Sequence, residues 1–297
     1  MQSHNNRATI GKLLIFSAVA ISAGWIGLGL DLLLGASHSQ GPGQLLWLVM
    51  PLLTAVLLRT FTDDGWKDSG VRVKLTQNAV WYTFSLLLFP FSAALTLVIG
   101  LITGLTTVPA YSPAIGGFFL KTVFLGLLPS FVKNIFEEFA WRGYLAPRIS
   151  SLGINDLAGH ALAGLVWATW HVPYYLFFLD RASFTAYTSQ SFTTFFPMLF
   201  AGVLAMSFVY GEILLLTHSV WPLLLLHTVS NAIGSPLLLN GLIRMAPGAE
   251  VFVSPAPGSV ISIIVYCAIG TALYRFRLGK KKRGSNSPPE KKICRTA

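Results

Sequence analysis

Charged residues are scarce in this chain of 297 residues, at 11% of the sequence, whereas hydrophobic residues make up 54%. A soluble globular domain carries about 25% charged residues, so the composition argues against a soluble fold. The mean hydropathy of +0.64 points the same way. We therefore expect the chain to be embedded in lipid.

Cysteine is nearly absent, with Cys267 inside an apolar run and Cys294 near the C-terminus. Two such distant cysteines exclude a disulfide framework. The sequence also has no tandem repeat, no Gly-rich phosphate loop and no His-Glu-x-x-His zinc motif. These absences exclude a disulfide-stabilised secreted scaffold, a P-loop nucleotidase and the commonest helical zinc peptidase.

Long apolar runs are what the sequence has instead. About 20 apolar residues in a helix cross a hydrocarbon core that is roughly 30 Å thick. Eight runs are close to this length: 13–34, 45–61, 79–104, 118–146, 158–179, 193–217, 220–240 and 259–276. We therefore predict an all-α, polytopic membrane protein of about eight transmembrane helices. Residues 1–279 would form one membrane domain, and residues 280–297 a basic, disordered tail.

The positive charges of the loops predict the orientation. One set of loops and both termini receive most of them: Arg7, Lys12, Arg59, Lys67, Arg72, Lys74, Arg148, Lys280, Lys281, Lys282 and Arg283. The opposite loops receive little beyond Lys121, Arg181 and Arg244. The positive-inside rule then places both termini in the cytoplasm, in the plasma membrane if the host is bacterial. Topology and membrane lipids explain the net charge of +10, so no nucleic-acid partner is expected.

Polar residues inside the apolar runs are the candidates for function, because an ionisable side chain there costs about 2.5–3.5 kcal/mol. They are Glu137, Glu138, Arg142, His171, Glu212, His227 and Asn231. We interpret Glu212 as structural or interfacial. Asp31, Lys121 and His218 lie near the ends of runs, where we expect them to reach the membrane interface.

Helical spacing separates their roles. Glu138 and Arg142 are four residues apart, so they can form an ion pair, while Glu137 points about 100° away and is free for chemistry. His227 and Asn231 are also four apart, and both can donate hydrogen bonds to a developing oxyanion. Glu137 and His171 can then deprotonate a water that attacks a peptide carbonyl. The sequence therefore predicts a peptidase that needs no cofactor and no Ser or Cys nucleophile.

Three motifs on three apolar runs carry a resemblance to a known family. They read Glu137-Glu138-Phe-Ala-Trp-Arg142, Trp167-Ala-Thr-Trp-His171 and His227-Thr-Val-Ser-Asn231. Over residues 118–240 the chain resembles the CPBP family, the CAAX protease and bacteriocin-processing (Abi) proteins that include the type II CAAX prenyl endopeptidases. Trp167 stands where the second motif usually has Phe.

This resemblance implies an intramembrane glutamate-type endopeptidase with about eight helices and a cavity open to the cytoplasmic side. Glu137 and His171 would activate water, His227 and Asn231 would form the oxyanion hole, and Glu138 and Arg142 would support them. Trp167 would be an aromatic wall residue. The substrate would be a peptide or lipidated peptide, of CAAX or bacteriocin type.

Two alternatives stay open on the sequence alone. Glu137 or Glu138, together with His171 and His227, could ligate zinc and make a metalloprotease. The polar pocket could instead serve a bacteriocin-immunity or other membrane binding protein, or a transporter, without hydrolysis.

Overall fold

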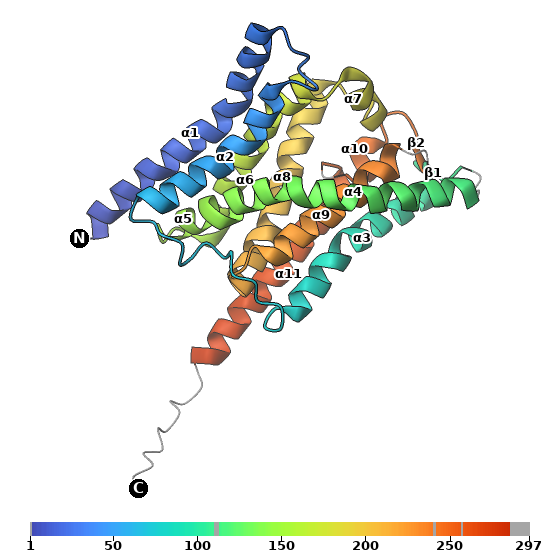
Figure 1. Cartoon of the computed structure of the whole chain (residues 1–297). Coiled ribbons are helices and arrows are strands. Elements are labelled where there is room, and N and C mark those ends of the chain that lie inside the picture. Colours follow the sequence, from blue (N-terminus) through green and yellow to red (C-terminus); the bar gives the residue numbers. More distant parts are fainter. Residues whose placement is uncertain (1, 110–112, 240–241, 257, 286–297) are drawn as a thin grey trace.

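The computed structural model describes residues 2–109, 113–239, 242–256 and 258–285 (Figure 1). The long helices are α1 (Gln2–Leu34), α2 (Pro42–Phe61), α3 (Ala79–Ile102), α4 (Pro113–Ala140), α6 (Asp156–Pro173), α8 (Phe192–Thr217), α9 (Trp221–Leu239) and α11 (Val260–Ser285). The shorter ones are α5 (Ala146–Ser150), α7 (Arg181–Tyr187) and α10 (Glu250–Val253), with π-helical turns η1 (Trp141–Leu145) and η2 (Tyr174–Phe178). In these ranges the only strands are β1 (Thr106–Thr107) and β2 (Arg244–Met245), an antiparallel pair.

Each of the eight predicted runs is helical over most of its described residues, so the all-α class is confirmed. Within the described residues, six helical stretches are long and apolar enough to cross a membrane: Asn6–Leu34, Pro42–Phe61, Ala79–Ile102, Pro113–Ser150, Phe192–Thr217 and Val260–Lys282. Helices α6, with 18 residues, and α9, with 19 residues, are not among these six stretches. The number of eight transmembrane helices and the cytoplasmic position of the termini stay predictions.

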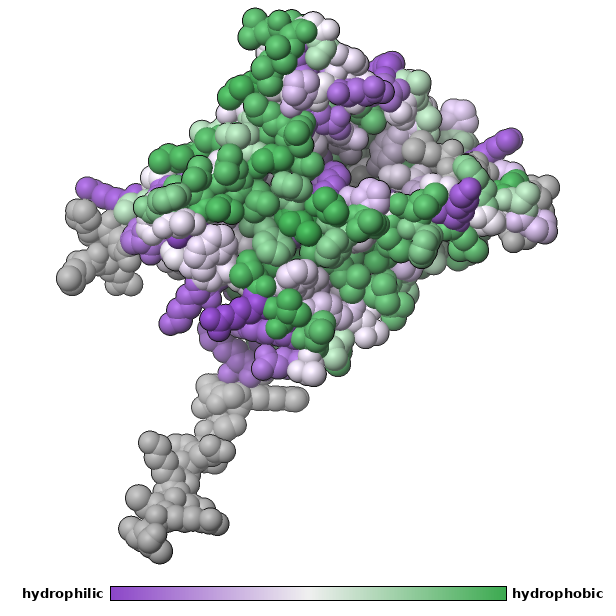
Figure 2. Space-filling view, in the orientation of Figure 1, coloured by the Kyte–Doolittle hydropathy of each residue, from purple (hydrophilic) through white to green (hydrophobic). Residues whose placement is uncertain are grey.

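The molecular surface fits a lipid environment. Figure 2 shows hydrophobic residues spread over α1, α2 and α4, with hydrophilic residues concentrated below them and at the upper rim. Helix α8 differs, because much of it is buried inside the bundle. The motif residues Glu137, Glu138, Arg142 and His227 are also buried, so they have protein, not lipid, around them.

Helices α1 and α2 pack so closely that their backbones touch. A Cβ on Gly27 would collide with the Gly43 carbonyl, and a Cβ on Gly43 with that of Gly27. Asp31 lies in this contact, fully buried, and its Oδ1 accepts a hydrogen bond from the Gly43 amide at 2.8 Å. The expectation that Asp31 reaches the interface is therefore wrong, because its carboxylate caps the start of α2 instead.

Two tryptophans tie α2 to α6. The rings of Trp47 and Trp170 stack with centroids 3.9 Å apart. The Trp47 indole N–H donates to the Trp170 carbonyl at 2.8 Å, and the Trp170 indole N–H donates to the Trp47 carbonyl at 3.1 Å. Both rings are almost completely buried, and the two hydrogen bonds satisfy both of their N–H groups. This reciprocal pair fixes the last turns of α6, where His171 follows Trp170.

Two of the three motifs adjoin a π-helical turn: η1 begins at Trp141, inside the first motif, and η2 begins at Tyr174, shortly after His171. Such turns are frequent at functional sites. In η1 the Gly143 carbonyl accepts two hydrogen bonds from Arg59 of α2, through Nε at 2.8 Å and Nη2 at 2.6 Å. The buried Arg59 thus satisfies a carbonyl of the irregular turn.

Helix α11 extends through Ser285, beyond the domain boundary expected at residue 279. Lys280, Lys281 and Lys282 are good helix formers and continue its last turns. Residues 286–297 of the expected tail, including Cys294, lie outside the described residues.

Candidate active site

Glu137 lies on α4 and is 1% exposed. Its Oε1 accepts a hydrogen bond from Lys133 Nζ at 2.5 Å, and its Oε2 accepts one from the Trp167 indole at 3.0 Å. The carboxylate is also close enough to His171 and His227 to interact electrostatically with both. The site thus holds a buried carboxylate beside two imidazoles.

His171, near the end of α6, has its Nδ1 2.8 Å from the Trp167 carbonyl oxygen. A carbonyl can only accept, so this hydrogen-bond network assigns the hydrogen to Nδ1. In the neutral ring, Nε2 then carries a lone pair. His171 can therefore accept a proton through Nε2.

His227 and Asn231 lie one turn apart on α9, and each contacts α4. His227 Nδ1 is 2.8 Å from Glu138 Oε1, and Asn231 Nδ2 donates to Asn134 Oδ1 at 3.0 Å. The Nδ1 hydrogen of His227 is therefore used by a carboxylate, and one of the two Nδ2 hydrogens of Asn231 by an amide. His227 Nε2 and the second Asn231 hydrogen are left for a ligand.

Glu138 and Arg142 are in contact, with Arg142 Nη1 2.9 Å from Glu138 Oε1. Glu138 is fully buried, and the guanidinium of Arg142 lies over the rings of Trp167, at 4.1 Å, and Tyr210, at 4.3 Å. Arg142 therefore neutralises Glu138 while packing against the aromatic wall. Both residues hold their neighbours in place from behind the cavity.

The predicted residues meet at one cavity of about 650 Å³. His171, His227, Asn231 and Trp167 line it, together with Lys133. Glu137 is not in the lining, because Lys133 and Trp167 cover its two oxygens. Aromatic rings supply much of the remaining wall: Trp47, Phe89, Tyr174, Tyr175 and Tyr187.

The cavity is in the half of the bundle away from the termini. Most of its lining comes from α4 and α9, and the rest includes parts of α3, the start of α2, the end of α6 with η2, the N-terminal half of α8, and α7. The resemblance implied a cavity open to the cytoplasmic side, and that opening stays a prediction.

Lys133 and Asn134 are functional candidates that the motifs did not indicate. Lys133 precedes Glu137 by four residues, so the spacing that predicted the pair of Glu138 and Arg142 also applies to it. Asn134 is fully buried on the same helix and had no comparable signal, since its amide carries no charge.

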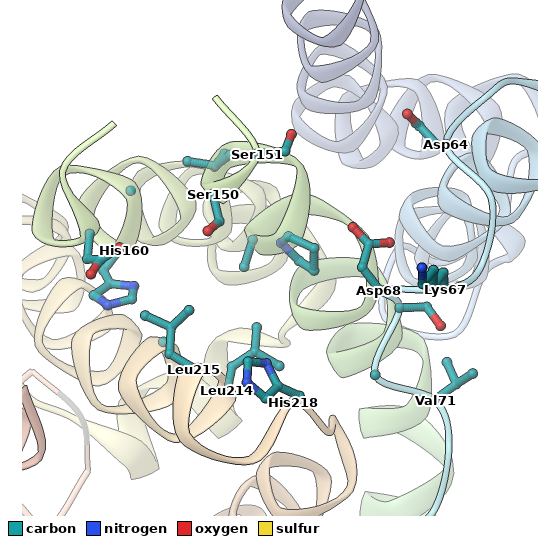
Figure 3. Close-up of a pocket in the computed structure, with 18 of the residues that line it drawn as sticks. Asp64, Lys67, Asp68, Val71, Ser150, Ser151, His160, Leu214, Leu215 and His218 are labelled. Carbon is teal, nitrogen blue, oxygen red and sulfur yellow. The ribbon is translucent and has the colours of Figure 1, made fainter. Parts of the chain in front are cut away.

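A second cavity, of about 710 Å³, lies at the other end of the bundle and contains none of the predicted site residues. Figure 3 shows Asp64, Asp68, Ser150, His160 and His218 around it. Its acidic wall is paired: Asp64 contacts Lys12 at 2.7 Å and Arg148 at 3.2 Å. The neighbouring Asp63 also accepts from Lys12, and this hydrogen bond holds the pKa of the Asp63 carboxyl below its ordinary value.

Glu212 belongs to a buried network beside this second cavity. Its Oε2 accepts from Arg277 Nε at 2.7 Å, and its Oε1 lies 3.1 Å from His160 Nε2. Arg277 also contacts Asp156 at 2.7 Å. The network joins α6, α8 and α11, which fits the structural role expected for Glu212.

The zinc alternative needs three ligands that converge. Among the residues that the structure describes, no group of three or more His, Cys, Asp or Glu side chains is arranged to hold a metal ion. His227 turns its Nδ1 to Glu138, and Glu137 is occupied by Lys133 and Trp167. In this arrangement the set Glu137, His171 and His227 does not fit a metal, and no chemical step is assigned to one.

Comparison with known proteins points to one family. Residues 119–233 match the family model described as type II CAAX prenyl endopeptidase Rce1-like. No curated protein matches the chain. The matched segment runs from α4 to α9 and contains all seven predicted site residues. The apolar helices and this match together indicate a multi-pass membrane protein. The resemblance predicted from the three motifs is therefore confirmed: the segment 119–233 is similar to the Rce1-like family.

Proposed function

We propose that the protein is an intramembrane endopeptidase that hydrolyses a peptide bond with a water activated by Glu137 and His171. The observation that carries this proposal is that His171, His227 and Asn231 line one cavity, while Glu137 lies directly behind its wall and is hydrogen-bonded to the lining residues Lys133 and Trp167. The family match to endopeptidases supports it.

Water activation follows from the free atoms of the site. A water between Glu137 and His171 Nε2 would donate to both, once the Glu137 oxygen held by Lys133 exchanges that partner for the water. The water oxygen then attacks the carbonyl carbon of the substrate, and its proton passes to Glu137. Lys133 stays nearby as the counter-charge of the carboxylate.

The oxyanion that forms is stabilised by Asn231 and His227. Asn231 donates through its second Nδ2 hydrogen. His227 donates through Nε2 in its doubly protonated form, because its Nδ1 hydrogen is held by Glu138. Glu138 is then the counter-charge of the imidazolium, and Arg142 holds Glu138 in position. Collapse of the tetrahedral intermediate breaks the C–N bond, and Glu137 returns its proton to the leaving amine.

The decisive test is Glu137→Gln, which keeps the volume of the side chain but removes the base. We expect it to abolish cleavage of quenched peptides by purified protein in detergent or proteoliposomes. Glu250→Gln is the matched control, since Glu250 is a buried glutamate that accepts from the Ser189 amide outside the cavity. Cleavage by Glu137→Gln at the rate of the unaltered protein would remove Glu137 from the mechanism.

Metal independence is part of the same proposal. We expect full activity after prolonged treatment with a strong chelator and no stoichiometric zinc by elemental analysis of active protein. Loss of activity on chelation, with recovery on adding zinc, would favour the metalloprotease instead.

A further inference from the structure

The second cavity takes no part in the proposed chemistry, yet it has the size of a binding site. Its lining comes from the segment between α2 and α3, from α5 and the start of α6, and from the end of α8. Figure 3 shows Lys67, His160 and His218 on three sides of the opening. Its volume of about 710 Å³ is within the usual range of ligand pockets.

The acidic side chains of this lining are neutralised by cations that lie outside it. Each of the three aspartates forms an ion pair with a Lys or Arg of another element: Asp64 with Lys12 at 2.7 Å, Asp68 with Arg59 at 2.8 Å, and Asp156 with Arg277 at 2.7 Å. Arg148 contacts both Asp64 and Asp68. An anion in the cavity would therefore meet no unpaired carboxylate.

Three cations of the same lining have no such partner. In the part of the chain that the structure describes, no carboxylate forms an ion pair with Lys67, Arg72 or Lys74. Lys74 Nζ donates to the His218 carbonyl at 3.4 Å instead. Like charges around one cavity repel one another, and an anion between them removes this repulsion. The charge of the lining thus fits a negatively charged ligand.

The cavity lies where helices leave the membrane. Residues 62–78 join α2 to α3, two of the helices that are long and apolar enough to cross it, and α8, a third such helix, ends at Thr217. Trp66, which also lines the cavity, is 45% exposed. Exposed tryptophans of membrane proteins gather at the level of the lipid headgroups. The ligand would therefore be met at the membrane surface.

The remaining wall is apolar. Leu214 and Leu215 of α8, Ile149 of α5, and Val71 and Ile154 of the connecting segments face the same space as the three cations. A free inorganic anion has no use for such a wall, whereas an amphiphile fills it with hydrocarbon. The combination favours a ligand with an anionic head and an apolar chain.

The segment that carries the cations is held in place without a ligand. The Val220 amide donates to the Gly70 carbonyl at 3.0 Å, and the Trp221 indole N–H donates to the Val71 carbonyl at 2.7 Å. Gly70 has a φ of +66°, which favours glycine. Because the segment is tied to the start of α9, the cavity is largely preformed, and little order has to be gained on binding.

We propose that this cavity binds an acidic phospholipid, with the phosphate between Lys67, Arg72 and Lys74 and part of an acyl chain against the apolar wall. Basic pockets between transmembrane helices at the membrane surface bind anionic headgroups. Ser150 and Asn155 also line the cavity and offer a hydroxyl and an amide to a polar headgroup. The proposal does not depend on the peptidase activity.

Lipid retention tests the proposal on the full-length protein, purified in a neutral detergent. Native mass spectrometry and the Tm are recorded after addition of phosphatidylglycerol or phosphatidylcholine. We expect one phosphatidylglycerol to stay bound to each chain and to raise the Tm, and phosphatidylcholine to do neither. Equal retention of the two lipids would overturn the proposal, because the charge of the headgroup would then be irrelevant.

A matched pair of triple variants locates the site. The cavity variant combines Lys67→Gln, Arg72→Gln and Lys74→Gln, and the control combines Lys280→Gln, Lys281→Gln and Lys282→Gln at the end of α11, outside the lining. We expect the cavity variant to bind phosphatidylglycerol about 100-fold more weakly, and each of its single changes to weaken binding about fivefold. The control should bind almost as the unaltered protein does. Equal weakening in both triple variants, or none in the cavity variant, would overturn the proposal.

Soluble phosphates separate a lipid from its headgroup alone. Glycerol phosphate and inorganic phosphate, each at millimolar concentration, are added to the lipid-free protein and to the protein with bound phosphatidylglycerol. We expect neither compound to raise the Tm as the lipid does, nor to displace the lipid. Stabilisation by either one to the same extent as by phosphatidylglycerol would identify a soluble phosphate as the ligand and overturn the assignment to a lipid.

Discussion

The oxyanion hole offers the sharpest test of the site, through Asn231→Ala. This change removes a donor that would act on the tetrahedral intermediate, and loss of one such donor lowers kcat by about 10²–10³-fold, or roughly 2.7–4 kcal/mol. KM should change little, because the donor acts mainly on the transition state. Kinetics with a quenched peptide in proteoliposomes would separate the two constants.

The same change also has a structural cost. Asn231 donates to Asn134, which is fully buried and whose own Nδ2 has no hydrogen-bond partner in the structure. Losing this partner leaves a buried amide unsatisfied, which costs about 1–3 kcal/mol of stability. A thermal unfolding experiment in detergent should therefore show a lower Tm for Asn231→Ala.

Asn134→Ala is the control that separates the two effects. It breaks the same hydrogen bond and should lower the Tm to a similar extent, but it keeps the donor of Asn231. We expect its kcat to fall by less than about tenfold, since only the orientation of Asn231 is loosened. If the two variants lose kcat equally, or if Asn231→Ala keeps kcat within a few-fold, then Asn231 does not stabilise the oxyanion.

Three further predictions concern stability and charge. Lys133→Met should lower both the Tm and kcat, because the buried Glu137 loses its counter-charge. Lys133→Arg keeps the positive charge and should retain much of both. Equal Tm and kcat values for the two variants would show that the charge of Lys133 is irrelevant. Arg277→Met should lower the free energy of unfolding of the membrane domain by about 3–5 kcal/mol, because the buried Glu212 loses its counter-charge. Its KM should be unchanged. Gly27→Ala should push α1 away from α2 and lower the Tm, whereas Gly29→Ala should leave the Tm unchanged, because a Cβ at Gly29 meets open space. A similar Tm for both variants would refute the close backbone contact.

The helices and several site residues could be predicted from the sequence, because polar residues stand out within long apolar runs. Eight apolar runs predicted eight helices, and the polar residues inside three of them predicted which side chains meet. Glu137, His171 and His227 stand out because a lipid-facing position would penalise them so heavily. The same contrast explains why Arg142 was recognised as the partner of Glu138.

Other parts of the site lacked such contrast. Asn134 is an uncharged amide, and nothing in its spacing marks it as the acceptor for Asn231. Lys133 did have a signal, its four-residue spacing from Glu137, but Glu137 was interpreted as free because its neighbour already had a partner. Asp31 was assigned to the interface from its position near the end of a run, yet burial depends on α2, which packs across it.

The position of the cavity could not be predicted either, because it depends on how several helices pack against one another. The depth of a residue can be estimated along its own helix, but the side on which a cavity opens depends on which helix ends gather around it. In this fold the end of α6 and the start of α2 do so, held by Trp47 and Trp170. The π-helical turns η1 and η2 likewise have no signal in the apolar pattern of a single run.

The π-helical turn η1 has a consequence for the length of the catalytic helix. Such a turn holds one residue more than an α-helical turn, so deleting a single residue there would replace its i→i+5 hydrogen bonds with regular i→i+4 bonds. The Gly143 carbonyl, which accepts two hydrogen bonds from Arg59, would then be drawn into the regular helix. The widened turn after the glutamates therefore supplies the carbonyl that satisfies the buried Arg59.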